Sequence, residues 1–221
     1  MAIPELLDWP TEVTEARAIQ DRWRDRVEVC DRLDPVNWVA GVDLGFENEG
    51  RTTRAAAALL SYPNLELVET AIAICPTIFP YIPGYLSFRE VPPILKALRQ
   101  LTVFPDLILC DGQGLAHPRR FGLACHLGVL LDCPTIGVAK SRFIGTHGEP
   151  GRKRGSWELL KDEEETIGAV LRTRTKVKPL YVSTGHRVSL ETAISYVLAC
   201  APDYRLPETT RIADRLASNR M

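Results

Sequence analysis

The chain has 221 residues, of which 45% are hydrophobic, and this is enough to bury a sizeable core, so we expect one domain over 1–221. Its 27 basic and 28 acidic side chains give a net charge of -1, which excludes a uniformly basic nucleic-acid binder and leaves only a local basic surface for such a partner. No apolar run approaches the ~20 residues that span a bilayer, the N-terminus lacks a signal pattern, and the 6 cysteines lack zinc spacing, so we expect reduced thiols in a cytoplasmic monomer.

The first part of the chain predicts one helix and then three strands. Residues 11–30 carry apolar side chains at helical spacing without Gly or Pro, which predicts an amphipathic helix. Residues 38–43 form a short apolar strand that ends in an acid, and strand-like runs follow at 55–62 and 65–74. The short connections between these strands favour an antiparallel meander.

The rest of the chain predicts alternating helices and strands. After a loop rich in Pro and Gly, we expect helix 91–101, strand 107–110, helix 123–131, strand 135–139, strands 166–174 and 180–183, and helix 190–200. A stretch at 142–156 looks irregular. A three-strand meander followed by helix–strand units predicts an α/β fold with a mixed sheet and helices on both faces, and the order resembles the ribonuclease-H-like fold.

Two aspartates stand where predicted strands end. Asp43 and Asp111 each close an apolar run, and each is followed by a glycine within two residues. Because ligands of open α/β sheets gather at the carboxyl ends of strands, the two carboxylates would converge if their strands are parallel neighbours. Converging carboxylates repel each other unless a cation lies between them, and Mg²⁺ suits such a site. Each aspartate alone more often begins a turn, so the pair suggests a metal site without specifying one.

Glu90 has two interpretations. Ser87-x-x-Glu90 fits a capping box at the start of the next helix. Pro92 and Pro93 would then fall in the second turn, where a missing N–H removes a helix hydrogen bond. We favour a helix that starts nearer Glu90 and leaves its carboxylate free to face the strand ends.

Four motifs, in this order, resemble the endonuclease V family. They are Val39-Ala40-Gly41-Val42-Asp43, Tyr81-Ile82-Pro83-Gly84 with Leu86-Ser87-Phe88-Arg89-Glu90, Asp111-Gly112-Gln113-Gly114-Leu115-Ala116-His117-Pro118-Arg119-Arg120, and Pro134-Thr135-Ile136-Gly137-Val138-Ala139-Lys140-Ser141. They cover about the middle half of the chain, with weaker echoes at 184–187 and 211–214. The resemblance implies an enzyme that nicks DNA close to a deaminated base such as hypoxanthine.

The resemblance also implies a role for the acids and one lysine. Asp43, Asp111 and Glu90, the last directly or through water, would organise Mg²⁺, for which Mn²⁺ would substitute. Lys140 would support the scissile phosphate, because a compact positive charge suits charge that develops on a phosphoryl group. Asp214 is the least secure ligand, because the family accepts an acid or a histidine there. A solvated position on a C-terminal helix is its alternative.

The loop residues would expose and recognise the base. Tyr81, on a loop with Ile82, Pro83 and Gly84, would wedge into the duplex, and its alternative is a loop aromatic packed on its own domain. Main-chain groups can read a flipped base where no side chain intervenes, and the implied pocket residues are Gly84, Leu86, Gly112, Gly114, Leu123 and Gly137. Ordinary turns are the alternative for these glycines.

Basic residues suggest where nucleic acid would lie. His117 would act as a general acid or phosphate ligand beside two phosphate-binding cations, Arg119 and Arg120, although such a cluster is usually a solvated loop. In an extended chain, the cations of 172–178 would share one face and could follow a phosphate backbone. Protection of an edge strand by charge is the commoner reason for such a stripe. The basic loop 152–154 has the same two interpretations, and the acidic run 162–165 would face away from DNA.

The sequence therefore predicts a metal-dependent endonuclease for DNA that contains deaminated bases. The resemblance places the cut at the second phosphodiester 3′ to the lesion and leaves a 3′-hydroxyl and a 5′-phosphate. Inosine-containing RNA is the alternative substrate, because no feature excludes a 2′-hydroxyl. A binding module without cleavage would have lost a metal acid, and a hydrolase of free nucleotides would not need the Tyr81 loop.

Overall fold

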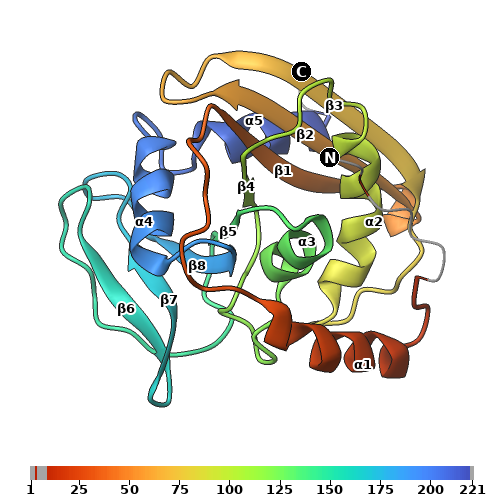
Figure 1. Ribbon diagram of the computed structural model, residues 1–221, viewed down its shortest axis with the longest axis horizontal. Coiled ribbons are helices and arrows are strands. Elements are labelled where there is room, and N and C mark those ends of the chain that lie inside the picture. Colours follow the sequence, from red (N-terminus) through yellow and green to blue (C-terminus); the bar gives the residue numbers. More distant parts are fainter. Residues whose placement is uncertain (1–2, 4–8, 220–221) are drawn as a thin grey trace.

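Eight strands form one mixed sheet in the computed structural model, which describes residues 3 and 9–219 (Figure 1). Most of the N-terminal stretch considered for a signal pattern lies outside the described residues. The strands are β1 (Trp38–Glu47), β2 (Thr52–Ser61), β3 (Leu67–Pro76), β4 (Leu107–Cys110), β5 (Thr135–Ala139), β6 (Trp157–Asp162), β7 (Glu165–Leu171) and β8 (Leu180–His186). Their order across the sheet is β3-β2-β1-β4-β5-β8-β7-β6.

The strand directions confirm the predicted mixed sheet. β1, β2 and β3 form the antiparallel meander. β1, β4 and β5 are parallel neighbours, and β5, β8, β7 and β6 then alternate in direction. β6 was not predicted, because its mixture of apolar and charged residues shows no clear alternation. The three parallel strands stand at the centre of the sheet and bring the residues that follow β4 and β5 to one edge.

Helices cover both faces of the sheet, as predicted. They are α1 (Val13–Trp23), α2 (Leu86–Leu98), α3 (Leu123–Leu131), α4 (Leu190–Ala199) and α5 (Glu208–Ala217), with short 3₁₀ turns η1 (Arg24–Arg26) and η2 (Asn48–Gly50). Alternation along β1 separates two cores: Ala40 and Val42 pack with α2 and α3, whereas Val39 packs in the core that contains α4. Within the described part of the chain, no helix is long and apolar enough to cross a membrane.

Two predicted helices have different bounds. The helix predicted over 11–30 ends at Trp23, where the chain tightens into η1 and then becomes extended at Val27. α2 begins at Leu86 and not near Glu90, and both prolines lie inside it. Phe88 O, which loses its helical donor at Pro92, instead accepts a hydrogen bond of 2.7 Å from Trp9 Nε1.

The capping-box interpretation was also wrong. The N-cap residue of α2 is Tyr85, and it has no side-chain cap. Ser87 lies within the helix, where its Oγ is 3.0 Å from Nδ1 of the buried His126. The early start places Glu90 in the second turn of α2, on the helix that packs over β1 and β2.

The prediction that residues 172–178 form an extended basic stripe was wrong as well. β7 ends at Leu171, and the following residues form turns before β8 begins. Arg172 is buried and donates to three backbone carbonyls, of Gly151, Pro150 and Val177. The cations of 172–178 therefore do not share one face of a strand.

Candidate functional site

Three carboxylates from distant parts of the chain meet at one edge of the sheet. One oxygen atom from each of Asp43, Asp111 and Asp214 lies within 4.8 Å of the others. Asp43 and Asp111 are neighbours because Val42 pairs with Cys110 in the parallel β1–β4 ladder. Asp43 does not end its strand, because β1 continues to Glu47 in its pairing with β2. The shorter β4 stops at Cys110, so Asp43 has no paired residue on the β4 side of its strand.

Two glycines of β1 bring the third carboxylate into place. A Cβ atom at Gly41 would lie 2.2 Å from the carbonyl carbon of Thr209, and one at Gly45 would lie 2.2 Å from Ala217 O. Both contacts are with the backbone of α5, so the helix can cross β1 this closely only where β1 has no side chain. Because Asp43 lies between the two glycines on the same face of β1, Asp214 of α5 comes to lie beside it.

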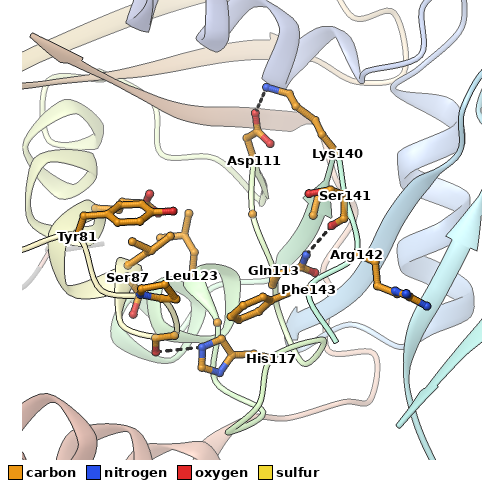
Figure 2. A pocket seen from close by; sticks show the side chains of 17 residues that line it. Tyr81, Ser87, Asp111, Gln113, His117, Leu123, Lys140, Ser141, Arg142 and Phe143 are labelled. Carbon is orange, nitrogen blue, oxygen red and sulfur yellow. Dashed lines mark hydrogen bonds and ion pairs between the residues drawn. The ribbon is translucent and has the colours of Figure 1, made fainter. Parts of the chain in front are cut away.

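A lysine lies among these acids. Lys140 directly follows β5, and its Nζ forms an ion pair with Asp111 and lies 3.3 Å from Asp214 Oδ1. Figure 2 shows its side chain reaching Asp111 along the upper side of the site. Lys140 thus neutralises part of the negative charge that the acids would otherwise share.

Without a cation, the acids are unfavourable neighbours when ionised. Burial, reinforced by the charge of Asp111, raises the pKa of Asp43 to about 7. Burial and the charges of Asp43 and Asp111 raise the pKa of Glu90 to about 8. The pKa of Asp111 is also raised by burial, although Lys140 opposes that shift. A hard divalent cation such as Mg²⁺ would relieve this repulsion, because it binds ionised carboxylate oxygens.

The raised pKa of Glu90 predicts a pH-dependent stability. A folded pKa of about 8, above the ordinary value of 4.5, means that metal-free protein loses stability as the pH rises from 4.5 through about 8. Glu90→Gln removes this loss, so we expect its Tm in EDTA to exceed that of wild type by several degrees at pH 8, at about 2–4 °C per kcal/mol. The difference should disappear at about pH 4.5. The exposed Glu164→Gln serves as the control, and an equal shift at both pH values would contradict the prediction.

A cavity of about 420 Å³ opens beside the acids, between Tyr81 and Phe143 (Figure 2). Its lining includes four of the predicted pocket residues, Gly84, Leu86, Gly112 and Leu123. It also includes residues that were given no role in the pocket. Gln113 belongs to a motif that resembles the family but was not assigned a function, and Arg142 and Phe143 lie in the stretch that looked irregular. Glu90, Asp111 and Lys140 line the same cavity, so the acids and the pocket form one site.

Two predicted pocket glycines lie behind the wall of the cavity. A Cβ atom at Gly114 would lie 2.1 Å from Thr184 O, and one at Gly137 would lie 2.4 Å from the backbone nitrogen of Gly114. Their role is to let β5, β8 and the loop after β4 approach each other closely. Neither glycine is among the residues that line the cavity, so the structure gives both a packing role, and their predicted base-facing role stays a prediction.

The loop before α2 is anchored on one carbonyl group. Gly84, at φ +83°, accepts hydrogen bonds from Gln20 Nε2 at 3.0 Å, His117 Nε2 at 3.1 Å and Arg119 Nη2 at 2.6 Å. Ile82 packs with buried aromatic residues, and Pro83 lines the cavity. Tyr81 is 70% exposed, so the loop holds an aromatic ring in solvent at the mouth of the cavity.

The predicted phosphate-binding cluster is engaged with the protein. Burial lowers the pKa of His117 to about 4, and its Nδ1 accepts from the backbone N–H of Arg119, so the ring is neutral at pH 7. Arg119 also stacks over Tyr85. Arg120 forms ion pairs with Asp162 at 2.9 Å and Glu165 at 2.7 Å. Neither arginine lines the cavity.

Comparisons with known proteins place this geometry in a family. Residues 21–215 match the family model for Endonuclease V. Endonuclease V of Trichormus variabilis is 61% identical over 213 residues, which cover 96% of each chain. The crystal structure of Endonuclease V from Streptomyces avermitilis is similar with a TM-score of 0.92 and 46% identity, over 99% of this chain and 97% of that one. A structure of Endonuclease V from Ciona intestinalis, in complex with a 23mer DNA containing an inosine followed by a ribo-adenosine, is similar with a TM-score of 0.82 and 29% identity. The match covers 94% of this chain and 95% of that one.

Proposed function

Because the chain belongs to the endonuclease V family, we propose that it is a metal-dependent endonuclease that cuts DNA near deaminated bases such as hypoxanthine. One observation carries this proposal: three clustered carboxylates and a lysine lie beside a cavity that has an exposed tyrosine at its mouth. The six free cysteines suit a reducing compartment. We place the enzyme in the cytoplasm, as a single-domain monomer.

The residues present fit Mg²⁺, with Mn²⁺ as a substitute. Asp43, Asp111 and Asp214 would hold the ion, and Glu90 would act directly or through water. When bound, the ion supplies a Lewis acid for a phosphate oxygen and lowers the pKa of water, the nucleophile of phosphodiester hydrolysis. Lys140 brings a positive charge to the mouth of the cavity, where it would hold the scissile phosphate. The cut at the second phosphodiester 3′ to the lesion, with 3′-hydroxyl and 5′-phosphate products, is part of the proposal.

The cavity would receive the flipped base. Its volume of about 420 Å³ lies in the range of small-molecule sites, and Gly84 and Gly112 expose main chain on its wall. Leu86 and Leu123 add apolar surface against which a planar ring can stack. Neutral His117, fixed on Gly84 O, would shape this wall without adding charge.

Tyr81 is expected to fill the gap that a flipped base leaves in the stack. Aromatic stacking returns roughly 1–3 kcal/mol, so Tyr81→Ala should weaken binding to a hypoxanthine duplex by about ten- to a hundredfold. Tyr81→Phe should bind like wild type, and the defect should shrink on single-stranded DNA. Affinity is measured in Ca²⁺, with Tyr204→Ala as the control at another exposed tyrosine. An equal loss on both substrates would return Tyr81 to a loop-packing role.

Inosine-containing RNA is a second candidate substrate. The Ciona relative was crystallised on DNA in which a ribo-adenosine follows the inosine, so that protein accommodates a 2′-hydroxyl next to the lesion. The deciding experiment compares nicking of matched DNA and RNA strands with one hypoxanthine or none, with and without Mg²⁺. Nicking of DNA that requires both hypoxanthine and Mg²⁺ supports the proposed function, and failure to nick DNA while RNA is cut would replace it with the second candidate.

A further inference from the structure

Two loops near β6 and α4 gather basic side chains. They cover residues 151–155, before β6, and 172–178, between β7 and β8. Six of their cationic side chains are exposed and form no ion pair within the described part of the chain. One of them, Arg154, donates to the backbone carbonyls of Leu198 and Ala201. The other five are Arg152, Lys153, Arg174, Lys176 and Lys178. We call these five residues the basic platform.

A buried arginine fixes the two loops to each other. Arg172 donates to Gly151 O at 2.7 Å on one loop and to Val177 O on the other. The backbone N–H of Lys176 donates to Arg152 O at 3.0 Å, which joins the loops a second time. Burial of a guanidinium group costs free energy unless its N–H donors are paired. The hydrogen bonds of Arg172 therefore hold the two loops together as part of the folded structure. They fix the backbones of the two loops relative to each other, so the exposed side chains of the basic platform project from neighbouring positions.

A second arginine connects the basic platform to the proposed active site. Arg205 donates from Nη2 to Lys140 O at 2.9 Å and from Nε to Lys178 O at 2.9 Å. Ala139 pairs with Tyr181, Leu180 with Leu171, and Leu171 with Trp157, so the chain segments beyond these positions emerge at the same sheet edge. The outer part of the basic platform is then about three strand spacings, or about 14 Å, from Lys140.

We propose that the basic platform binds the phosphate backbone of duplex DNA on one side of the cut. This inference rests on the proposed nuclease function and adds a surface that none of the cavity residues provides. One strand of B-DNA rises 3.4 Å per phosphate, so a distance of about 14 Å corresponds to about four base pairs. The cationic side chains that run along this sheet edge from Lys140 to Arg152 suit a long polyanion that enters the site. They supply a local attraction for DNA in a protein whose net charge of -1 supplies no general one.

The test compares two variants that lose the same charge. The platform variant is Arg152→Gln, Lys153→Gln, Arg174→Gln and Lys176→Gln, which leaves Lys178 and Lys140 untouched. The control variant is Arg24→Gln, Arg26→Gln, Arg32→Gln and Lys96→Gln. Arg32 lies at the other end of β8, where its N–H donates to Arg187 O, and Lys96 lies on α2. Affinity is measured in Ca²⁺ for hypoxanthine duplexes whose arms on either side are about three or about twelve base pairs.

The platform variant is expected to lose affinity only for duplexes in which the arm on one side of the hypoxanthine, the side that reaches the basic platform, is long. The loss should be about ten- to a hundredfold at low salt, and the slope of log K against log salt should become shallower by about 0.9 for each lost contact, or two to four in total. With that arm short, the platform variant should bind like wild type. The control variant should bind like wild type on every duplex.

Three results would overturn the proposal that the basic platform binds DNA: equal losses of affinity in both variants, a loss of affinity that does not depend on arm length, or no loss of affinity. A loss confined to RNA arms of the same length would also overturn it in favour of an RNA partner. Single-turnover nicking of the short-arm duplex, at saturating enzyme and Mg²⁺, tests the proposed function separately. If wild type fails to nick, that function fails, while the arm-dependent affinities still decide whether the basic platform binds DNA.

Discussion

Asp43→Ala and Asp111→Ala are each expected to lower the single-turnover nicking rate by more than about a hundredfold. Each removes one of the carboxylates that lie within 4.8 Å of one another, so the ion would lose a ligand and a share of the charge that holds it. The fold should survive, because each change also removes a carboxylate that burial and its neighbours disfavour when ionised.

The measurement is cleavage of a hypoxanthine duplex at saturating enzyme over a range of Mg²⁺ concentrations. Asp34→Ala, which removes an exposed aspartate that follows η1, is the matched control and should cut like wild type. Binding in Ca²⁺ should fall much less than the rate, because the proposed base recognition depends on the glycine main chain and the leucines of the cavity and not on these two carboxylates. If either site variant cut like wild type at every Mg²⁺ concentration, the metal assignment would be wrong.

The second large effect is expected for Lys140→Ala, which should slow single-turnover cleavage at saturating Mg²⁺ by about a hundredfold or more. Its ammonium group is the cation in contact with Asp111 and Asp214 at the mouth of the cavity. In the proposed reaction, this group would stabilise the charge that develops on the phosphate in the transition state more than it stabilises the ground state. The rate should therefore fall far more than the affinity for the lesion in Ca²⁺.

Two further variants separate this role from a general effect of charge. Lys140→Arg should recover part of the rate, because it keeps the charge but changes its shape. Lys96→Ala removes an exposed lysine from α2 and should cut like wild type. Equal losses of rate and affinity for Lys140→Ala would make Lys140 a binding residue and contradict the assignment to the transition state.

Most of the sheet could be predicted because its strands are apolar runs with clear ends. The strand at 135–139 and the helix at 123–131 have the predicted bounds. β1 appeared too short, because Asp43 and Gly45 interrupt its apolar pattern, and the continued pairing with β2 depends on contacts far away in the sequence. The early start of α2 was missed for a similar reason: Trp9 supplies the donor that Pro92 lacks, and no local pattern records that bond.

The candidate site was only partly visible in the sequence. Asp43 and Asp111 could be joined by the logic of parallel strands. Asp214 needed α5, and the sequence suggested a C-terminal helix there only in the alternative that left Asp214 solvated. The buried positions of α5 are two threonines and two alanines, which carry little apolar signal, although Ile212 and Leu216 recur at helical spacing. The available signal was the spacing of Gly41 and Gly45 on either side of Asp43, which indicates that another backbone crosses β1 there. The role of Arg172 was hidden because only the folded loops show which carbonyls it reaches.

The crossing of α5 over β1 also determines when the carboxylate cluster can be completed during synthesis of the chain. Translation delivers Asp43 and Asp111 first and Asp214 roughly one hundred residues later, which is about 5 to 20 s at ordinary elongation rates. Until residues 208–217 are made and fold against Gly41 and Gly45, a nascent chain contains only two of the three clustered carboxylates. The proposed metal site is therefore complete only after α5 has been translated, and we expect a ribosome-bound chain that stops before Glu208 to lack the activity that depends on this site.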